Sequence, residues 1–267
     1  MTKLQELSLM QIKPEKVEGN SGTFVIEPLL PGFGLTIGNA MRRVLLSSLE
    51  GAAITSVRID GVTHEFSTID GVVQDVVDII LNLKQVRFKI ESDEPQMIIL
   101  EAKGKKKVTA GDFKCPTGVE IVNKDLFIAE LSEKGKFMLE ATVQRGRGYL
   151  PTELRKEENL PIGVIALDAS FSPVSRVNFN TQNTRVGKMT NFDKLLLEID
   201  TDGTITPQVA MEQAASILVD HFNNISGGAS EQAEAVVETV TTEEVTSEEA
   251  VEEKPKKARK TVKKEEI

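Results

Sequence analysis

Residues 30–51 read LPGFGLTIGNAMRRVLLSSLEG, and the fold of the whole chain depends on this stretch. Pro31, Gly32 and Gly34 interrupt regular structure at its start. Gly51 stands at its end, where helices commonly finish with a glycine. The segment between these residues is long enough for about four helical turns. The sequence therefore predicts a helix with a marked beginning and end.

This predicted helix has apolar residues on two faces. At about 100° per residue, one face carries Ile37, Met41, Val44, Leu45 and Ser48. The nearly opposite face carries Leu35, Leu46 and Leu49. Because a surface helix needs only one apolar stripe, two stripes indicate a helix buried on both sides. A core helix of a monomer and a helix shared with a second protein both fit. The adjacent Arg42 and Arg43 favour the second interpretation, because charged side chains are rarely buried unpaired.

The remaining pattern alternates between strands and two further helices. Residues 8–29 read as an extended pair around a turn at 19–22, and residues 137–143 alternate apolar and polar side chains, as in a sheet with one wet face. Asp70 is the expected cap of a second helix that ends at Lys84. Thr206 and Pro207 are the expected start of a final helix that runs to about Asn224. Further strand signals lie at 53–59, 86–90, 97–102, 120–122, 126–129, 162–167, 174–180 and 195–199.

The end of the chain has a different composition. Residues 231–253 contain nine acids and no base, whereas residues 254–264 contain seven bases and no acid. Such a segment cannot bury enough apolar surface to offset the entropy of ordering the chain. We therefore expect a disordered tail over residues 228–267, first acidic and then basic.

Four further motifs follow the opening helix in a fixed order. They are IDGVTHEFSTIDGV (59–72), ILNLK (80–84), VQRGRGYLP (143–151) and FSPV (171–174). Together with residues 30–51, they resemble the amino-terminal assembly domain of the bacterial or plastid DNA-directed RNA polymerase alpha subunit, over about residues 8 to 226. The resemblance implies an α+β fold in two parts. A helix-plus-sheet dimerisation subdomain (1–51 and 172–227) would be interrupted by an inserted, mainly β subdomain (52–171).

The resemblance also implies a function. The family's alpha subunit is non-catalytic: it homodimerises and is the scaffold on which the beta and beta-prime subunits assemble for transcription. Matching positions imply a beta contact at Arg43 and Leu46, and a beta-prime contact at Lys84, Leu167 and Val174. The expected dimer interface comprises Phe33, Leu35, Leu46, Leu49, Leu218 and Phe222. The family's usual C-terminal DNA-binding domain has no counterpart in this sequence, and a weak DNA contact by the basic tail is a hypothesis.

The sequence shows no catalytic constellation. One cysteine and two histidines are too few for a disulfide framework or a Cys/His metal site, and the aspartates are not clustered as a two-Mg²⁺ centre requires. We expect no cofactor in this chain, with Mg²⁺ held only by the catalytic subunit of the complex. The sequence has no membrane span or signal peptide, so we expect a cytoplasmic or plastid-stromal protein.

Three alternatives stay open on the residues alone. A homodimeric adaptor of another assembly would use the same two-faced helix. A small nucleotide-binding enzyme would use Gly32-Phe33-Gly34 as a phosphate-binding turn. Arg145 and Arg147, each followed by glycine, suit an RNA clamp, a solvated turn or a protein contact at a strand end, and we favour the protein contact.

Overall fold

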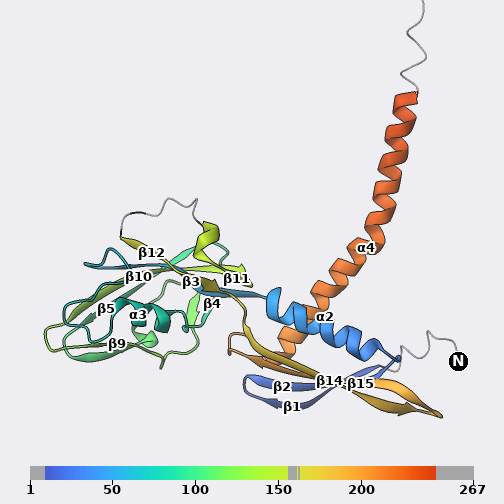
Figure 1. Cartoon of the computed structure of the whole chain (residues 1–267), viewed down its shortest axis with the longest axis horizontal. Coiled ribbons are helices and arrows are strands. Elements are labelled where there is room, and N and C mark those ends of the chain that lie inside the picture. Colours follow the sequence, from blue (N-terminus) through green and yellow to red (C-terminus); the bar gives the residue numbers. More distant parts are fainter. Residues whose placement is uncertain (1–9, 156–160, 162, 245–267) are drawn as a thin grey trace, which may run out of the picture. The chain divides into compact units, whose positions relative to one another are not determined.

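The computed structural model describes residues 10–155, 161 and 163–244, with backbone alone from residue 228 onward (Figure 1). The described chain forms two units, which divide after Leu218. The helices are α2 (Phe33–Ser47), α3 (Val76–Leu83) and α4 (Pro207–Glu244), with short 3-10 turns at Ala110–Asp112 and Thr152–Arg155.

One part of the first unit is a four-stranded antiparallel sheet covered by α2 (Figure 1). Its strand order is β1-β2-β15-β14. The predicted extended pair at 8–29 is confirmed as the hairpin β1–β2, and a second long hairpin supplies the other two strands. The core between α2 and the sheet also takes in the first turns of α4, where Ala210 and Ala214 are fully buried. The strands are β1 (Gln11–Glu18), β2 (Ser21–Leu29), β14 (Val174–Val186) and β15 (Met189–Thr201).

The second part is the β-rich region inserted between α2 and β14 (Figure 1). Its main sheet has the order β7-β5-β10-β3-β4-β8, with β12 added to β3. The predicted alternation at 137–143 is confirmed: Phe137, Leu139, Ala141 and Val143 are buried in β10. Helix α3 packs on this core through Val76, Ile79, Ile80 and Leu83. The strands of the region are β3 (Glu50–Ile59), β4 (Phe88–Ile90), β5 (Gln96–Lys103), β6 (Lys106–Thr109), β7 (Phe113–Lys114), β8 (Val119–Ile121), β9 (Phe127–Leu131), β10 (Lys136–Arg147), β11 (Tyr149–Leu150), β12 (Val164–Ala166) and β13 (Ala169–Ser170). The α+β class with an inserted β-rich region is thus confirmed, and the exact domain boundaries stay a prediction.

The second helix begins later than its sequence pattern indicates. We expected a cap at Asp70, but α3 starts at Val76 with Asp75 in the capping position. Residues 70–74 form turns and bends instead, because Val72 makes a single bridge with Leu131 and the Val73 amide donates to the Glu130 carbonyl. Backbone hydrogen bonds to β9 therefore replace those that a helical turn would have made.

The final helix begins as predicted and ends later. Its first residue is Pro207, and the Thr206 hydroxyl accepts a hydrogen bond from the Val209 amide at 3.4 Å. It continues to Glu244 rather than ending near Asn224, through a stretch rich in alanine and glutamate, which have high helix propensity. The helix thus covers the first part of the segment for which we expected no structure. Residues 245–267 lie outside the described residues.

Candidate subunit interface

The inner face of α2 is set by small residues as well as apolar ones. Gly34, Gly38, Met41 and Leu45 are buried, and their spacing of four, three and four places them on one side of a helix. A Cβ atom at Gly38 would lie 2.5 Å from the ring of Phe179 in β14. The helix backbone therefore approaches the sheet more closely than any larger residue would permit.

The start of α2 is capped by a side chain from a distant strand. Asp193 in β15 accepts hydrogen bonds through Oδ2 from the amides of Gly32 at 2.9 Å and Gly34 at 3.0 Å. These bonds satisfy donors that a helix start leaves free, and a negative charge there is favourable. A bound phosphate would need the same amides. The geometry thus disfavours the phosphate-binding turn considered from the sequence.

The outer side of α2 leaves apolar side chains in solvent at its beginning. Phe33 is 51% exposed and Leu35 is 57% exposed. Beside Phe33 lies an apolar hollow of about 130 Å³ lined by Met10, Pro28, Leu29, Leu30, Phe33, Ile37 and Phe192. Of the other predicted interface residues in this segment, Leu46 is half-buried and Leu49 lies in the core of the same subunit. An open apolar surface therefore exists only toward the start of the helix.

Helix α4 carries the two remaining residues of the predicted dimer interface. Leu218 is half-buried at the end of the first unit. Phe222, in the second unit, is exposed, as are its apolar neighbours Val219 and Ile225. These three residues follow one another at intervals of three positions, so they lie toward one side of the helix.

The two adjacent arginines of α2 both reach solvent. Arg42 and Arg43 are exposed, and neither side chain forms an ion pair or a hydrogen bond with any residue that the structure describes. Besides its helical backbone bonds, Arg43 takes part in one further hydrogen bond among the described residues, in which its backbone carbonyl accepts from the Ser47 hydroxyl at 2.7 Å. Both guanidinium groups are therefore available to an external partner.

The three residues expected to face beta-prime have different environments. Lys84 follows α3, and its ammonium group lies 3.2 Å from the Asp168 carboxylate. A hydrogen bond from the Thr152 amide and the Lys84 charge lower the pKa of Asp168 below its usual value. Leu167 and Val174 are buried, one in the core of the inserted region and the other in the α2 core. Lys84 alone of the three offers its side chain to a partner.

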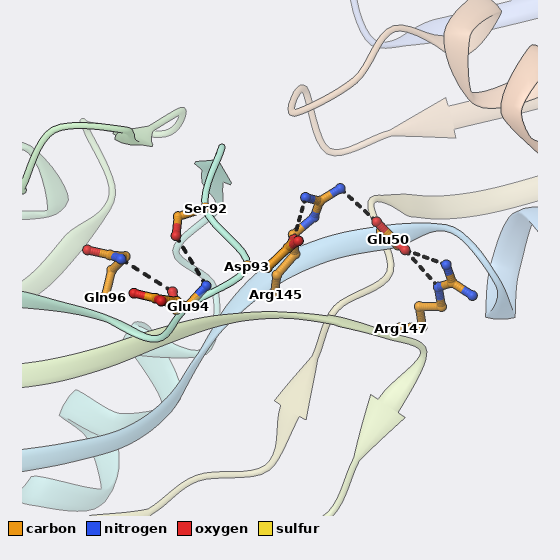
Figure 2. A network of polar contacts seen from close by, with 7 residues as sticks. All are labelled: Glu50, Ser92, Asp93, Glu94, Gln96, Arg145 and Arg147. Atoms are coloured by element: carbon orange, nitrogen blue, oxygen red, sulfur yellow. Dashed lines mark hydrogen bonds and ion pairs between the residues drawn. The ribbon is translucent and has the colours of Figure 1, made fainter.

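Arg145 and Arg147 belong to an ion-pair network at the end of β10 (Figure 2). Both bind Glu50 of the paired strand β3, with Arg145 at 2.7 Å, and Arg145 also reaches Asp93 at 2.8 Å. The hydrogen bond from Arg147 and the charges of both arginines lower the pKa of Glu50. Because acids of the same subunit already neutralise these arginines, the network suits a structural role better than an RNA clamp.

The described residues contain no group of three or more His, Cys, Asp or Glu side chains that could hold a metal ion. Among the same residues, no helix is long and apolar enough to cross a membrane. The arrangement that the described part does present is a helix with an apolar end and free arginines. This is the chemistry of a protein-binding surface.

Comparison with known proteins gives this surface its context. Residues 57–172 match the model of the RNA polymerase Rpb3/RpoA insert domain. The DNA-directed RNA polymerase subunit alpha of Carboxydothermus hydrogenoformans is 52% identical over 217 residues, which is 81% of this chain and 69% of the relative. The corresponding subunit of Symbiobacterium thermophilum is 55% identical over 206 residues, 77% of this chain and 65% of the relative. That of Moorella thermoacetica is 46% identical over 251 residues, 93% and 80% respectively.

The match to the insert-domain model falls on the β-rich region between α2 and β14, and the matches to the relatives extend to both sides of this region. Identity near one half over most of the chain agrees with the order of motifs in the sequence and with the fold. The chain belongs to the family of bacterial DNA-directed RNA polymerase alpha subunits, which assemble the core enzyme.

Proposed function

We propose that this alpha subunit acts as a homodimer whose interface is centred on the start of α2. The observation that carries the proposal is the exposed pair Phe33 and Leu35 beside an apolar hollow, on a helix whose other face is already buried. Large apolar side chains in contact with one another gain stability when a second surface covers them. The exposed Phe222 of α4 is the further residue that we assign to this interface.

The homodimer then holds the two large subunits, beta on one copy and beta-prime on the other. For beta, the supporting observation is Arg43, an exposed guanidinium group without a partner among the described residues. Half-buried Leu46 lies one turn further along the same helix and adds an apolar contact. For beta-prime, Lys84 is the exposed group, while the buried Leu167 and Val174 shape the surface around them rather than contact the partner themselves.

In this proposal the chain contributes architecture and no catalytic residue. The chain itself binds no cofactor, and the Mg²⁺ of the polymerase belongs to the catalytic subunit. The site of action is the cytoplasm of a bacterium, or the stroma of a plastid for a relative encoded there. Metal analysis of the purified chain tests the cofactor statement, and a stoichiometric metal ion that survives dialysis would contradict it.

Co-purification with the large subunits tests the proposed partners. An affinity tag on this chain should retain both of them in the wild type. Arg43→Ala should lose beta while the chain still dimerises, and Arg42→Ala on the same helix is the matched control. Equal recovery of beta with both variants would show that the contact has been assigned to the wrong residue.

A further inference from the structure

Two turns at one end of the inserted region carry the same short motif. Lys103-Gly104-Lys105 begins at the last residue of β5, and Lys134-Gly135-Lys136 ends at the first residue of β10. The Gly104 amide donates to the Gly135 carbonyl at 2.9 Å, so the two turns lie side by side. Lys103 and Lys136 are direct cross-strand partners in the β5–β10 ladder.

The glycines make this close approach possible. Gly104 has a φ of +74°, in the left-handed region that glycine tolerates best. A Cβ atom at Gly135 would lie 2.4 Å from the carbonyl oxygen of Gly71, the residue just before the bridge between Val72 and Leu131. The backbone thus fixes the positions of the four lysines relative to one another.

The four lysines, which we call the twin-turn cluster, are exposed; the hydrogen bond and charge of Lys114, together with the charge of Lys103, lower the pKa of the nearby Glu101. In the described part of the chain, none of Lys103, Lys105, Lys134 and Lys136 forms a salt bridge or a side-chain hydrogen bond. Their neighbours Lys106 and Lys114 do, with Asp112 and Glu101 respectively. Residues 101–107 and 130–136 together contain six lysines and three glutamates, in a chain whose net charge is -9. The cluster is therefore a basic patch on an acidic protein.

Placing like charges directly opposite in a sheet costs stability. The fold nevertheless aligns Lys103 with Lys136 and adds a lysine beyond each. Such an arrangement suits an external anion that carries several closely spaced charges. The two segments contain no aromatic residue on which an unpaired base could stack and no arginine fork for a bidentate contact. Lysines alone recognise phosphates as point charges without reading sequence.

We propose that the twin-turn cluster contacts the phosphate backbone of duplex DNA. This contact is separate from the dimer and the large-subunit surfaces proposed above, and it involves neither the basic tail nor base recognition. It supplies sequence-independent, salt-sensitive attraction between this subunit and DNA.

The test compares two full-length variants with the same change in charge. The cluster variant replaces the four lysines with glutamine. The control variant replaces four exposed lysines elsewhere: Lys13→Gln, Lys16→Gln, Lys89→Gln and Lys188→Gln. Binding of a labelled duplex of about 30 base pairs, which is about three helical turns, is followed by fluorescence anisotropy across a salt series. Each lysine that contacts a phosphate contributes about 0.9 to the slope of log K against log salt. The cluster variant should therefore lose about 2 to 4 from that slope, and the control variant should keep the wild-type value.

A second readout locates the contact and does not depend on the tail, which all variants share. Acetylation of the wild-type lysines, quantified by mass spectrometry, should fall severalfold at the cluster when the duplex is present and stay constant at Lys16 and Lys188. Single-stranded RNA should protect the cluster less.

Equal slopes for the two variants together with unchanged acetylation would overturn the proposal. Protection by a peptide of residues 231–253 but not by the duplex would overturn it in favour of an acidic protein partner. The cluster variant should still capture the large subunits in a pull-down. This measurement distinguishes a failure of DNA contact from a failure of the proposed assembly function.

Discussion

Shortening Leu35 tests the proposed dimer interface most sharply, because this side chain does little for the folded monomer. Complete burial of a leucine contributes roughly 1.5–3 kcal/mol. Since 57% of Leu35 is exposed in the single chain, covering that part would yield about 1–1.7 kcal/mol per subunit. A two-fold interface contains the residue twice. Leu35→Ala should therefore weaken dimerisation by about 2–3 kcal/mol, which is a roughly 30- to 200-fold higher Kd.

Sedimentation equilibrium over a range of protein concentrations measures this Kd directly. The matched control is Leu154→Ala, which shortens a leucine that is 74% exposed in the inserted region, away from α2. It should leave the Kd within about twofold of the wild type, because surface substitutions outside an interface change little. Thermal unfolding of both variants verifies that the fold is intact. A Kd for Leu35→Ala equal to that of the wild type, or an equal loss in the control, would refute the assignment of the interface.

Three further changes test individual contacts. Arg43→Ala should reduce beta capture by at least tenfold in a pull-down while dimerisation persists, because losing one member of an interfacial charge pair costs on the order of 2–5 kcal/mol. Asp193→Asn should lower the free energy of unfolding by about 0.3–1 kcal/mol in urea titrations, because the amide oxygen can still accept from the two amides but the negative charge at the start of α2 is lost; no change would mean that this charge does not stabilise the helix. Glu50→Gln should destabilise the chain at neutral pH. Since the arginines lower the folded-state pKa of Glu50, that contribution exists above the unfolded pKa and is lost as pH falls. The melting temperatures of wild type and variant should therefore converge in acid, and a constant gap from pH 7 to 3 would contradict this reasoning.

The sequence predicted those parts of the fold that depend on local pattern. Strand β10 follows from its alternation, and the start of α4 follows from a capping threonine before proline. The inner face of α2 was predicted through Met41 and Leu45, because apolar spacing in a helix is a local property. The order of motifs predicted the inserted region, which no periodicity could have revealed.

What the sequence did not predict depends on contacts between distant residues. Gly34 read as a chain break, yet it lies inside the first turn of α2, since the Asp193 carboxylate caps the helix there. The sequence pattern assigns no role to Gly38, although the Phe179 ring leaves no room for a larger residue there. The first turn predicted for α3 was lost to backbone pairing with β9. In each case the deciding partner lies far away along the chain. The contact can therefore be recognised only from the folded structure.

The candidate site divides in the same way. Exposed Phe33, Leu35 and Arg43 have the accessibility that a contact requires. Leu49 and Leu167 do not, because their own subunit already surrounds them. Amphipathic spacing alone could not separate an outer stripe from a second buried one. Which stripe is buried depends on where the first turns of α4 and the inserted sheet pack, and this packing is a property of the tertiary structure.

The central claim is that this chain is the dimeric platform on which the polymerase assembles. Native mass spectrometry of the complex purified through a tag on this chain tests it most directly. The result that we predict is one assembly with two copies of this chain and one copy each of the two large subunits. Leu35→Asp should abolish that assembly, because the proposed assembly needs two copies of this chain, one for each large subunit. An assembly with a single copy of this chain, or intact assembly by the monomeric variant, would contradict the claim.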